Sequence, residues 1–272
     1  SAQLAPLAPQ NALLIAESGF AEHADIRRVA PFVNGFLIGS ALSAQPDVDL
    51  ACRKLLYGQN KVCGLTRAED AINARSQGAV FGGLIFVERS PRCVTLKQAK
   101  QITTEANGLE YVGVFADQPL ESLIDTAKYV GLSAIQLHGH EDIDYVVQLR
   151  QQLRQAGLET VKIWKALAIE SPAQLPDLAV DAFVVDNRGG GSGKAFNWKL
   201  LEPLGTEERQ RCLLAGGIGP ESISSAIELG FAGVDINSQA EWKPGIKNSQ
   251  KVAQTFTKIR HYGRFSEKHL SN

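Results

Sequence analysis

The sequence has no methionine, only four cysteines and no excess of charge of either sign. Its formal charge of -1 leaves no basic surface of the kind that attracts nucleic acids or anionic lipids. Cys52, Cys63, Cys93 and Cys212 lack the paired spacing of a zinc site or a disulfide framework. We therefore expect reduced thiols, no metal and no nucleic-acid partner.

Long hydrophobic runs are also missing. Residues 79–87 form an apolar run with the length of a core strand, too short to cross a bilayer, so we expect no membrane partner. No charged and then apolar leader precedes the first expected strand, which favours a cytoplasmic protein. Because the chain starts at Ser1 and has no methionine, we expect it to be part of a longer reading frame.

Short apolar stretches and amphipathic helical patterns alternate along most of the chain. With 44% apolar and 21% charged residues, the 272-residue chain has a globular composition and can bury a core the size of one α/β barrel. Eight strands are expected, at 61–63, 80–86, 111–115, 134–137, 161–166, 182–186, 212–215 and 233–236. Helical patterns follow them at 68–76, 96–105, 120–130, 143–155, near Ser171, 198–201, 221–229 and 249–259. Because such crossovers join parallel strands, the sequence predicts an α/β protein with a (β/α)8 TIM barrel.

Several expected helix starts carry a capping box or a first-turn proline. These signals are Thr66 with Glu69, Thr95 with Gln98, Ser171 with Pro172 and Gln174, and Pro220.

In a parallel barrel, reactive groups lie just beyond the carboxyl ends of the strands. The candidates at these positions are Cys63, Arg92, His138, Asp186 with Asn187, Gly216 with Gly217, and Asp235 with Asn237. The loop at 188–194 is rich in glycine, so its backbone amides can approach an anion, and Ser192 adds a hydroxyl. With the next two loops it predicts a phosphate site, made of Gly191, Ser192, Gly193, Gly216, Gly217, Asn237 and Ser238.

Each candidate side chain also has a purely structural interpretation. Cys63 could be an inert core thiol and His138 a core histidine with satisfied hydrogen bonds. Asp186 could be a turn residue, Arg92 a solvated loop charge and Asp235 a carboxylate that serves only the strand end. All of these residues lie at the ends of strands of one expected barrel, which favours a functional site over five separate structural roles.

Several short motifs at these strand ends resemble the phosphoribosylanthranilate isomerase family. They are 61–66 (Lys-Val-Cys-Gly-Leu-Thr), 90–92, 112–115, 136–139, 185–186, 190–193 with Phe196 and Trp198, 215–217, and 244–247. The resemblance runs from about residue 61 to 262 and covers all eight expected strands. One departure is Gln239, where many members have glycine; a bulkier residue there could keep the backbone further from a phosphate.

This resemblance implies a cofactor-free Amadori rearrangement of N-(5-phosphoribosyl)anthranilate in tryptophan biosynthesis. Asp186 would be the acid that protonates the ring oxygen, which requires a carboxyl pKa raised by burial or a nearby negative charge. Cys63 would be the base that removes a proton from the second sugar carbon and must reach the thiolate form. Arg92 would bind the anthranilate carboxylate, while His138 and Asp235 would contact the substrate.

The first sixty residues predict two further βα units. Strands are expected at 13–16 and 35–38, and helices from about residue 24 and up to Leu56. These units resemble the last two βα units of indole-3-glycerol phosphate synthase. That family's phosphate loops match Ser18, Gly19, Gly39 and Ser40, and a substrate-site carboxylate matches Glu17. The resemblance implies that the intact protein carries a covalently linked synthase barrel.

Because the earlier strands and catalytic lysines of that family are missing here, we expect residues 1–60 to be a remnant without synthase activity. Two strands alone leave open edges, so this segment should pack poorly, lean on the second barrel or pair with another copy. We expect residues 61–262 to form the isomerase barrel and residues 263–272 a polar tail.

Two other functions stay open. A related barrel isomerase of histidine synthesis performs the same rearrangement with two aspartates, so Cys63 and Arg92 argue against it. A phosphate-ligand binding or assembly module whose chemistry has lapsed would saturate with substrate without converting it.

Overall fold

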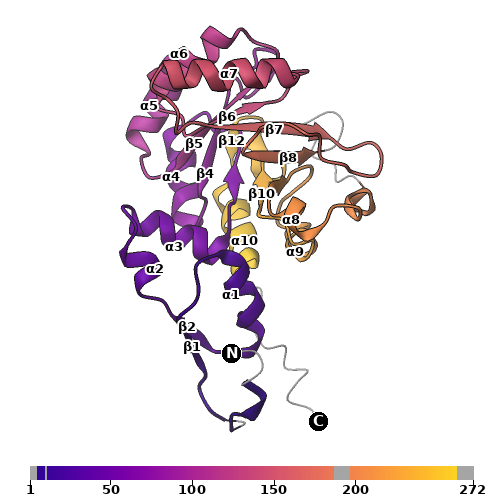
Figure 1. Cartoon of the computed structure of the whole chain (residues 1–272). Coiled ribbons are helices and arrows are strands. Elements are labelled where there is room, and N and C mark those ends of the chain that lie inside the picture. Colours follow the sequence, from indigo (N-terminus) through magenta and orange to yellow (C-terminus); the bar gives the residue numbers. More distant parts are fainter. Residues whose placement is uncertain (1–4, 10, 187–196, 262–272) are drawn as a thin grey trace.

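The computed structural model describes residues 5–9, 11–186 and 197–261. Eight parallel strands close into a barrel in the order β10-β3-β4-β5-β6-β7-β8-β9 (Figure 1). Their bounds are β3 Lys61–Val62, β4 Phe81–Ile85, β5 Glu110–Phe115, β6 Ala134–Leu137, β7 Lys162–Ala168, β8 Ala182–Asp186, β9 Cys212–Leu214 and β10 Gly233–Ile236. The expected (β/α)8 barrel is confirmed, and each bound lies within two residues of the expected one.

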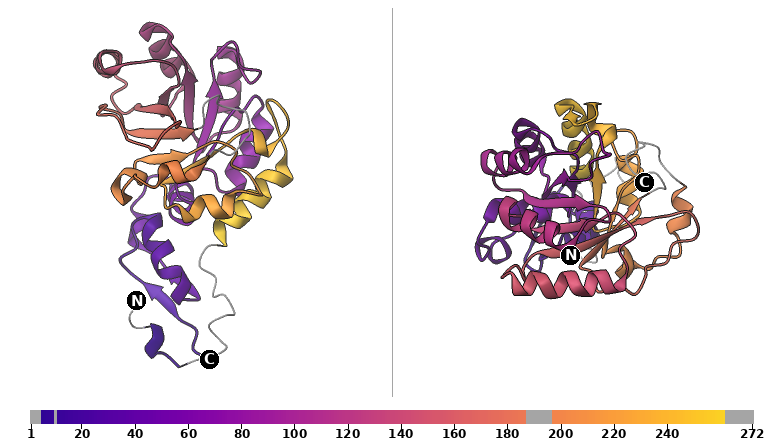
Figure 2. Two further views of the ribbon diagram at one scale, coloured as in Figure 1. Left: turned by 90° about the vertical axis from the view of Figure 1, so that its right-hand side faces the viewer. Right: turned by 90° about the horizontal axis from the view of Figure 1, so that it is seen from above.

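Helices surround the barrel when it is seen from above (Figure 2). Their bounds are α4 Ala68–Gln77, α5 Leu96–Glu105, α6 Leu120–Val130, α7 Ile143–Gln155, α8 Thr206–Arg209, α9 Ile223–Glu228 and α10 Ser249–Arg260. Two 3-10 helices, η3 Trp198–Leu201 and η4 Ser238–Ala240, and a hairpin of β11 Glu241–Lys243 with β12 Ile246–Lys247 complete this part. The sequence patterns missed the hairpin and α8.

Three expected helix starts are wrong, and the one at Thr95 with Gln98 is confirmed as a capping box. The helix α4 begins at Ala68 without a side-chain cap, because the Thr66 hydroxyl donates to the carbonyl of Gly245 in the β11–β12 hairpin. Pro220 lies in the turn before α9.

No helix forms near Ser171, because prolines interrupt this stretch and its backbone bonds elsewhere. Residues 169–181 contain neither helix nor strand. The amide of Ala173 instead donates to the carbonyl of Leu200 in η3 at 2.7 Å. An irregular connection therefore joins β7 to β8.

The barrel interior changes from apolar to polar along its axis. Its floor is a cluster in which the rings of Phe81 and Trp164 meet edge to face at 4.8 Å. Above this floor, Lys61 hydrogen-bonds Gln136 and Asp235 across the interior. This polar pair of contacts lies below the strand ends where Cys63 is found, so a charged group is buried directly beneath the mouth.

The described residues before β3 form a small unit beside the barrel (Figure 1). It contains η1 Ala5–Leu7, β1 Ile15–Glu17, α1 His23–Val29, η2 Ala30–Phe32, β2 Gly35–Leu37, α2 Ser40–Ser43 and α3 Val48–Tyr57. β1 and β2 pair in parallel, as expected. A separate cluster around Phe20 and Ile26 forms its core.

The helix α3 joins this unit to the amino-terminal end of the barrel. Arg53 is buried and donates to the carbonyls of Ala79 and Gly108, which precede β4 and β5. Tyr57 meets Phe256 of α10 edge to face at 5.9 Å. The segment therefore leans on the barrel, which is one of the expected arrangements; pairing with another copy stays a prediction.

Within the described ranges, no helix has both the length and the apolar character needed to cross a membrane.

Candidate active site

A cavity of about 440 Å³ opens at the carboxyl ends of the barrel strands. It brings together the candidate residues Cys63, Arg92, His138, Asp186, Gly216, Gly217, Asp235, Asn237 and Ser238. Gly191, Ser192 and Gly193, expected at the phosphate site, lie outside the described residues, as does Asn187. The described residues thus supply one pocket that contains both the thiol and the carboxyl expected from the sequence.

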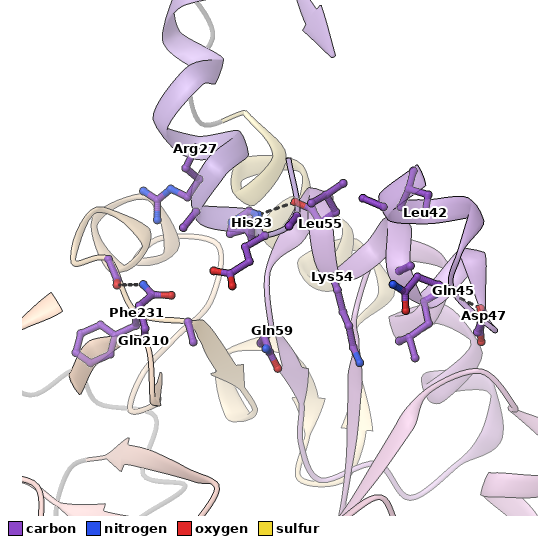
Figure 3. Close-up of a pocket in the computed structure, with 18 of the residues that line it drawn as sticks. His23, Arg27, Leu42, Gln45, Asp47, Lys54, Leu55, Gln59, Gln210 and Phe231 are labelled. Carbon is purple, nitrogen blue, oxygen red and sulfur yellow. Dashed lines mark hydrogen bonds between the residues drawn. The ribbon is translucent and has the colours of Figure 1, made fainter. Parts of the chain in front are cut away.

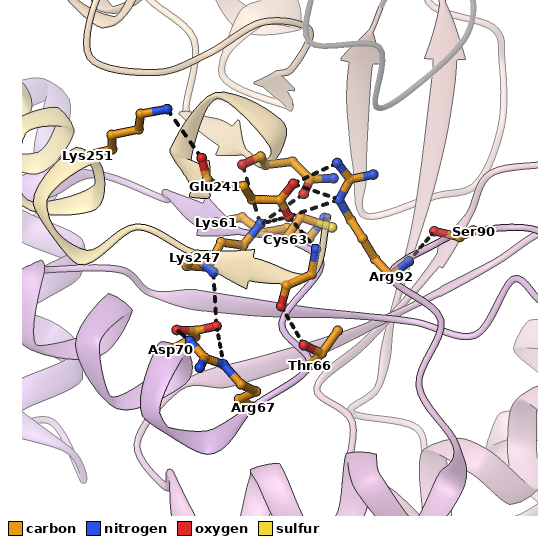
Figure 4. A network of polar contacts seen from close by, with 12 residues as sticks. Lys61, Cys63, Thr66, Arg67, Asp70, Ser90, Arg92, Glu241, Lys247 and Lys251 are labelled. Carbon is orange, nitrogen blue, oxygen red and sulfur yellow. Dashed lines mark hydrogen bonds and ion pairs between the residues drawn. The ribbon is translucent and has the colours of Figure 1, made fainter. Parts of the chain in front are cut away.

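Cys63 lies in the hydrogen-bond network of a fully buried lysine (Figure 4). Cys63 directly follows β3 and its amide continues the pairing with β10, so strand alternation places its side chain on the same face as that of Lys61. The Lys61 ammonium donates to Cys63 Sγ at 3.2 Å, to Gln136 Oε1 at 2.9 Å and to Asp235 Oδ2 at 2.7 Å. Burial raises the pKa of the Cys63 thiol, and Lys61 opposes this rise. Burial favours a neutral amine, yet Asp235 and Cys63 keep the pKa of Lys61 above its usual value.

The same ammonium settles the tautomer of His138. An ammonium only donates, so the Gln136 atom facing Lys61 is its oxygen, and its amide NH2 faces His138 Nδ1 at 3.4 Å. Burial, and then Lys61, lower the pKa of His138, which favours the neutral ring. Since Nδ1 accepts from Gln136, the proton resides on Nε2. His138 can therefore offer an N–H to a ligand.

Arg92 is buried and paired, so its interpretation as a solvated loop charge is wrong. Its Nε and Nη2 donate to the carboxylate of Glu241 at 2.7–3.1 Å. Lys247 donates to the same carboxylate at 2.8 Å. Although burial alone would raise the pKa of Glu241, Arg92 and Lys247 hold it below its usual value. Glu241 thus holds the edge of the guanidinium that carries Nε and Nη2. The same pairing fixes the orientation of the Nη1 group.

Two glycines leave room around the thiol. A Cβ on Gly83 would lie 2.7 Å from Cys63 Sγ and 2.9 Å from Lys61 Cε. Gly64, at φ +70°, has Arg92 Cδ at 2.6 Å from the position of a Cβ. Glycine at both positions therefore allows β3 and β4 to bring the thiol, the ammonium and the guanidinium together.

The phosphate corner expected from the sequence is formed in part by the described residues. Gly216 and Gly217 have φ of +82° and +73°, a region that favours glycine. Ser222 donates to the carbonyl of Gly217 at 2.8 Å, which holds the turn before α9. Gln239 lies in η4, and its Cβ would be 2.5 Å from a Cβ on Gly219. The bulk of Gln239 is therefore accommodated because residue 219 is glycine.

The Oδ1 atom of Asp235 is buried and has no hydrogen-bond partner in the described part of the chain. Its other oxygen accepts from Lys61. Because Asp235 lines the cavity, a ligand hydroxyl is a suitable donor to this oxygen. No group of three or more His, Cys, Asp or Glu among the described residues is arranged to hold a metal ion.

The sequence interpretation assigned no role to four charged or polar residues of this site. They are Lys61, Gln136, Glu241 and Lys247. A lysine two positions before Cys63 in a short buried strand was a usable signal, because alternation puts both on one face. Glu241 had no local signal, since Arg92 lies far away in the sequence.

The model of the N-(5'phosphoribosyl)anthranilate (PRA) isomerase family matches residues 60–258. The chain belongs to this family. Isomerases of the family have solved structures that resemble this one: that from Thermus thermophilus has a TM-score of 0.66 and 32% identity, covering 74% of this chain and 98% of that one. Another, in complex with reduced 1-(o-carboxyphenylamino)-1-deoxyribulose 5-phosphate, has a TM-score of 0.62 and 26% identity, covering 75% and 98%.

Curated relatives of this PRA isomerase family member carry the name tryptophan biosynthesis protein TrpCF. The tryptophan biosynthesis protein TrpCF of Yersinia pestis is 44% identical over 261 residues, covering 96% of this chain and 53% of that protein. Its counterpart in Vibrio cholerae is 43% identical over 266 residues, covering 96% and 54%. The chain spans about half the length of these relatives. Its residues 1–55 match the indole-3-glycerol phosphate synthase model, so the expected synthase fragment is confirmed.

The residues expected at the remnant synthase site lie far from the isomerase cavity. Glu17 ends β1, Ser18 and Gly19 follow it, and Gly39 and Ser40 follow β2. All five are exposed, and Ser18 has φ +65°. A cavity of about 850 Å³ between this unit and the barrel floor does not include them; it is lined by residues such as His23, Lys54 and Phe231 (Figure 3).

Proposed function

We propose that residues 61–262 form a PRA isomerase barrel that catalyses the Amadori rearrangement of N-(5-phosphoribosyl)anthranilate to 1-(2-carboxyphenylamino)-1-deoxyribulose 5-phosphate. The observation that carries this proposal is that Cys63 and Asp186 line one cavity at the barrel mouth. Family membership and the compound bound to the ligand-bound relative support the same substrate class, a phosphorylated sugar joined to an aromatic amine.

The proposed reaction needs one acid and one base on either side of the substrate. Asp186 donates a proton to the ring oxygen, and the furanose opens to a cationic Schiff base. Cys63 then accepts the proton of the second sugar carbon, and the electron pair of that C–H bond forms the enamine and neutralises the iminium nitrogen. The enamine tautomerises to the ketose, so the atoms balance without a cofactor.

The other lining residues have binding roles in this proposal. Arg92 meets the anthranilate carboxylate with guanidinium N–H groups that Glu241 does not occupy. His138 donates from Nε2 to a sugar oxygen, and Asp235 Oδ1 accepts from a sugar hydroxyl. The phosphate lies at the opposite corner, held by backbone and hydroxyl groups of Gly191, Ser192, Gly193, Gly216, Gly217, Asn237 and Ser238.

Turnover tests this proposal. The chain is mixed with N-(5-phosphoribosyl)anthranilate and the loss of substrate fluorescence is followed. Cys63→Ala and Asp186→Ala should each lower kcat by about 10²–10⁴-fold, the usual contribution of a positioned acid or base. Cys52→Ala in α3 and Asp125→Ala in α6 are matched controls far from the cavity and should keep the rate.

A lapsed binding or assembly module gives a different result in the same assay. It would bind the substrate to saturation without conversion. The unaltered chain and both variants would then show no turnover. That outcome would replace the isomerase by the binding module.

We also propose domain limits at 1–60, 61–262 and 263–272, with the first domain continuing into a linked synthase barrel in the longer protein. The synthase match at 1–55 and the length of the relatives support this. Because only two of its βα units are present, the chain should form no indoleglycerol phosphate. Detection of that product from this chain alone would contradict the prediction.

We place the reaction in the cytoplasm. All four cysteines are free, which suits a reducing compartment. Isomerase activity in the membrane or periplasmic fraction of fractionated cells would contradict this location.

A further inference from the structure

We infer that Lys61 is a positioning residue for the isomerase: its buried ammonium is shared between Cys63 and Asp235 and sets how readily the Cys63 thiol becomes a thiolate. This inference rests on the proposed function, in which Cys63 is the base. The reactivity of the Cys63 thiol then depends on the Lys61 ammonium and on Asp235, which competes for that ammonium.

The geometry around the ammonium leaves it little freedom. Lys61 is fully buried, and its three N–H bonds are directed to Cys63, Gln136 and Asp235. An ammonium that donates to sulfur at 3.2 Å favours the thiolate, because the anion is the stronger acceptor. Backbone pairing keeps this arrangement rigid, since Lys61 pairs with Asp235 in the β10–β3 register and the Cys63 amide donates to Ile236 at 2.8 Å.

Asp235 acts in the opposite direction. Its carboxylate is 2.7 Å from the same ammonium, closer than the sulfur, so part of the positive charge is already balanced. A second anion on Cys63 would then face Asp235 across one shared cation, which keeps the thiol protonated in the empty pocket. The positive Schiff base of the bound substrate would supply the missing charge at the moment when the base is needed.

Other charged groups also face the thiol. They lie in or just after β4, β6, β8 and β10 and in the β11–β12 hairpin, and they are Arg89, Arg92, His138, Asp186, Asp235, Glu241 and Lys247. Arg92 and Lys247 share the single negative charge of Glu241, which balances only part of their positive charge, and Lys247 also lowers the pKa of the Cys63 thiol. Lys61 is the cation that donates a hydrogen bond directly to the sulfur.

Alkylation of Cys63 by iodoacetamide at pH 8, followed by peptide mass spectrometry, tests this without substrate. Removing the cation in Lys61→Gln should slow alkylation at least tenfold, whereas removing the competing anion in Asp235→Asn should accelerate it at least tenfold. These changes correspond to thiol pKa shifts of about one unit or more in opposite directions. A merely structural role would change both variants in the same direction.

Two cysteines of the same chain serve as internal standards. Cys52 lies in α3 at the other end of the barrel, so its rate should stay unchanged. Cys212 is fully buried in β9, so its alkylation reports unfolding. If Cys212 becomes reactive in Lys61→Gln, that variant has unfolded and the test depends on Asp235→Asn. An alkylation rate of Cys63 that is unchanged or slower in Asp235→Asn overturns the inference. An unaltered chain without turnover would refute the isomerase and leave this thiol measurement valid.

Discussion

At the scale of single residues, the barrel mouth keeps its buried charges in pairs. Lys61 pairs with Asp235, and Glu241 pairs with both Arg92 and Lys247. A buried charge without a partner is costly, so each pair also fixes the directions of the side chains that carry it. The shape of the pocket is therefore set by ion pairs as much as by apolar packing.

Gly83 is predicted to be essential for the position of the thiol. In Gly83→Ala the new methyl group would press on Cys63 Sγ and Lys61 Cε, so we expect kcat to fall at least tenfold while the chain stays folded. Steady-state kinetics measure this. Gly205→Ala is the control, because a Cβ there would contact only Glu208 Oε2 at 3.6 Å; equal losses in both variants would contradict the prediction.

Glu241→Gln should weaken substrate binding. The amide keeps the size of the carboxylate but loses its charge, so the buried cations Arg92 and Lys247 lose their partner. We expect KM to rise by roughly 10–100-fold, the equivalent of about 1.5–3 kcal/mol for a charged hydrogen bond. An unchanged KM together with a reduced kcat would show that Glu241 does not orient Arg92 for binding.

At the scale of elements, α3 belongs by sequence to the synthase fragment but packs against the isomerase barrel. Its Arg53 caps two carbonyls at the barrel floor, and its Lys54 pairs with Glu110 of β5 at 2.9 Å. The part of the chain that packs as the isomerase barrel therefore includes α3, although the isomerase family match begins only at residue 60.

Arg53→Ala should destabilise the barrel, because two carbonyls at its floor lose their donor. We expect a loss of about 2–4 kcal/mol in the free energy of unfolding, measured by urea denaturation. Arg75→Ala is the matched control: Arg75 pairs with the same Asp49 but is 40% exposed, so its loss should be below about 1 kcal/mol. Similar losses would show that the pairing with Asp49, and not the carbonyls, matters.

The contact between α1 and α3 should weaken in acid. Burial lowers the pKa of His23 from 6.5 to about 4, and His23 Nδ1 lies 2.9 Å from the Leu55 carbonyl. Since the unfolded segment binds the proton first, stability is complete above pH 6.5 and is lost as the pH falls toward 4.

Hydrogen exchange of the α1 amides between pH 7 and 4 measures this loss. His23→Gln removes the titrating group, so its α1 protection should vary less with pH than that of the unaltered chain. An identical pH dependence in both chains would refute the role of His23.

At the scale of the whole molecule, the candidate site and the N-terminal unit occupy opposite ends of the barrel (Figures 1 and 2). A chain that starts at residue 47 keeps α3 and should unfold near the temperature of the full chain. One that starts at residue 59 loses α3, so we expect its Tm to fall by roughly 5–10 °C, given about 2–4 °C per kcal/mol. Both should keep turnover, because α3 lies away from the cavity.

Calorimetry and the fluorescence assay check this pair of truncations. A fall in Tm already in the longer fragment would assign the stabilisation to β1, β2 and α1 instead of α3. Loss of activity in the shorter one would show that the floor of the barrel supports its mouth.

The sequence determined the barrel, because each strand and most helices have a local hydrophobic period that needs no distant partner to be recognised. It also placed Cys63, Arg92, His138, Asp186 and Asp235 at strand ends, since their positions follow from where the apolar runs stop. Only the tertiary structure decided how these groups are paired. Lys61 meets Asp235 across 174 positions and Arg92 meets Glu241 across 149, and no local pattern encodes such contacts. It also decided that α3 covers the isomerase floor, where Leu50 packs against the buried cluster, and that no helix forms after β7, where the amide of Ala173 bonds to the distant carbonyl of Leu200.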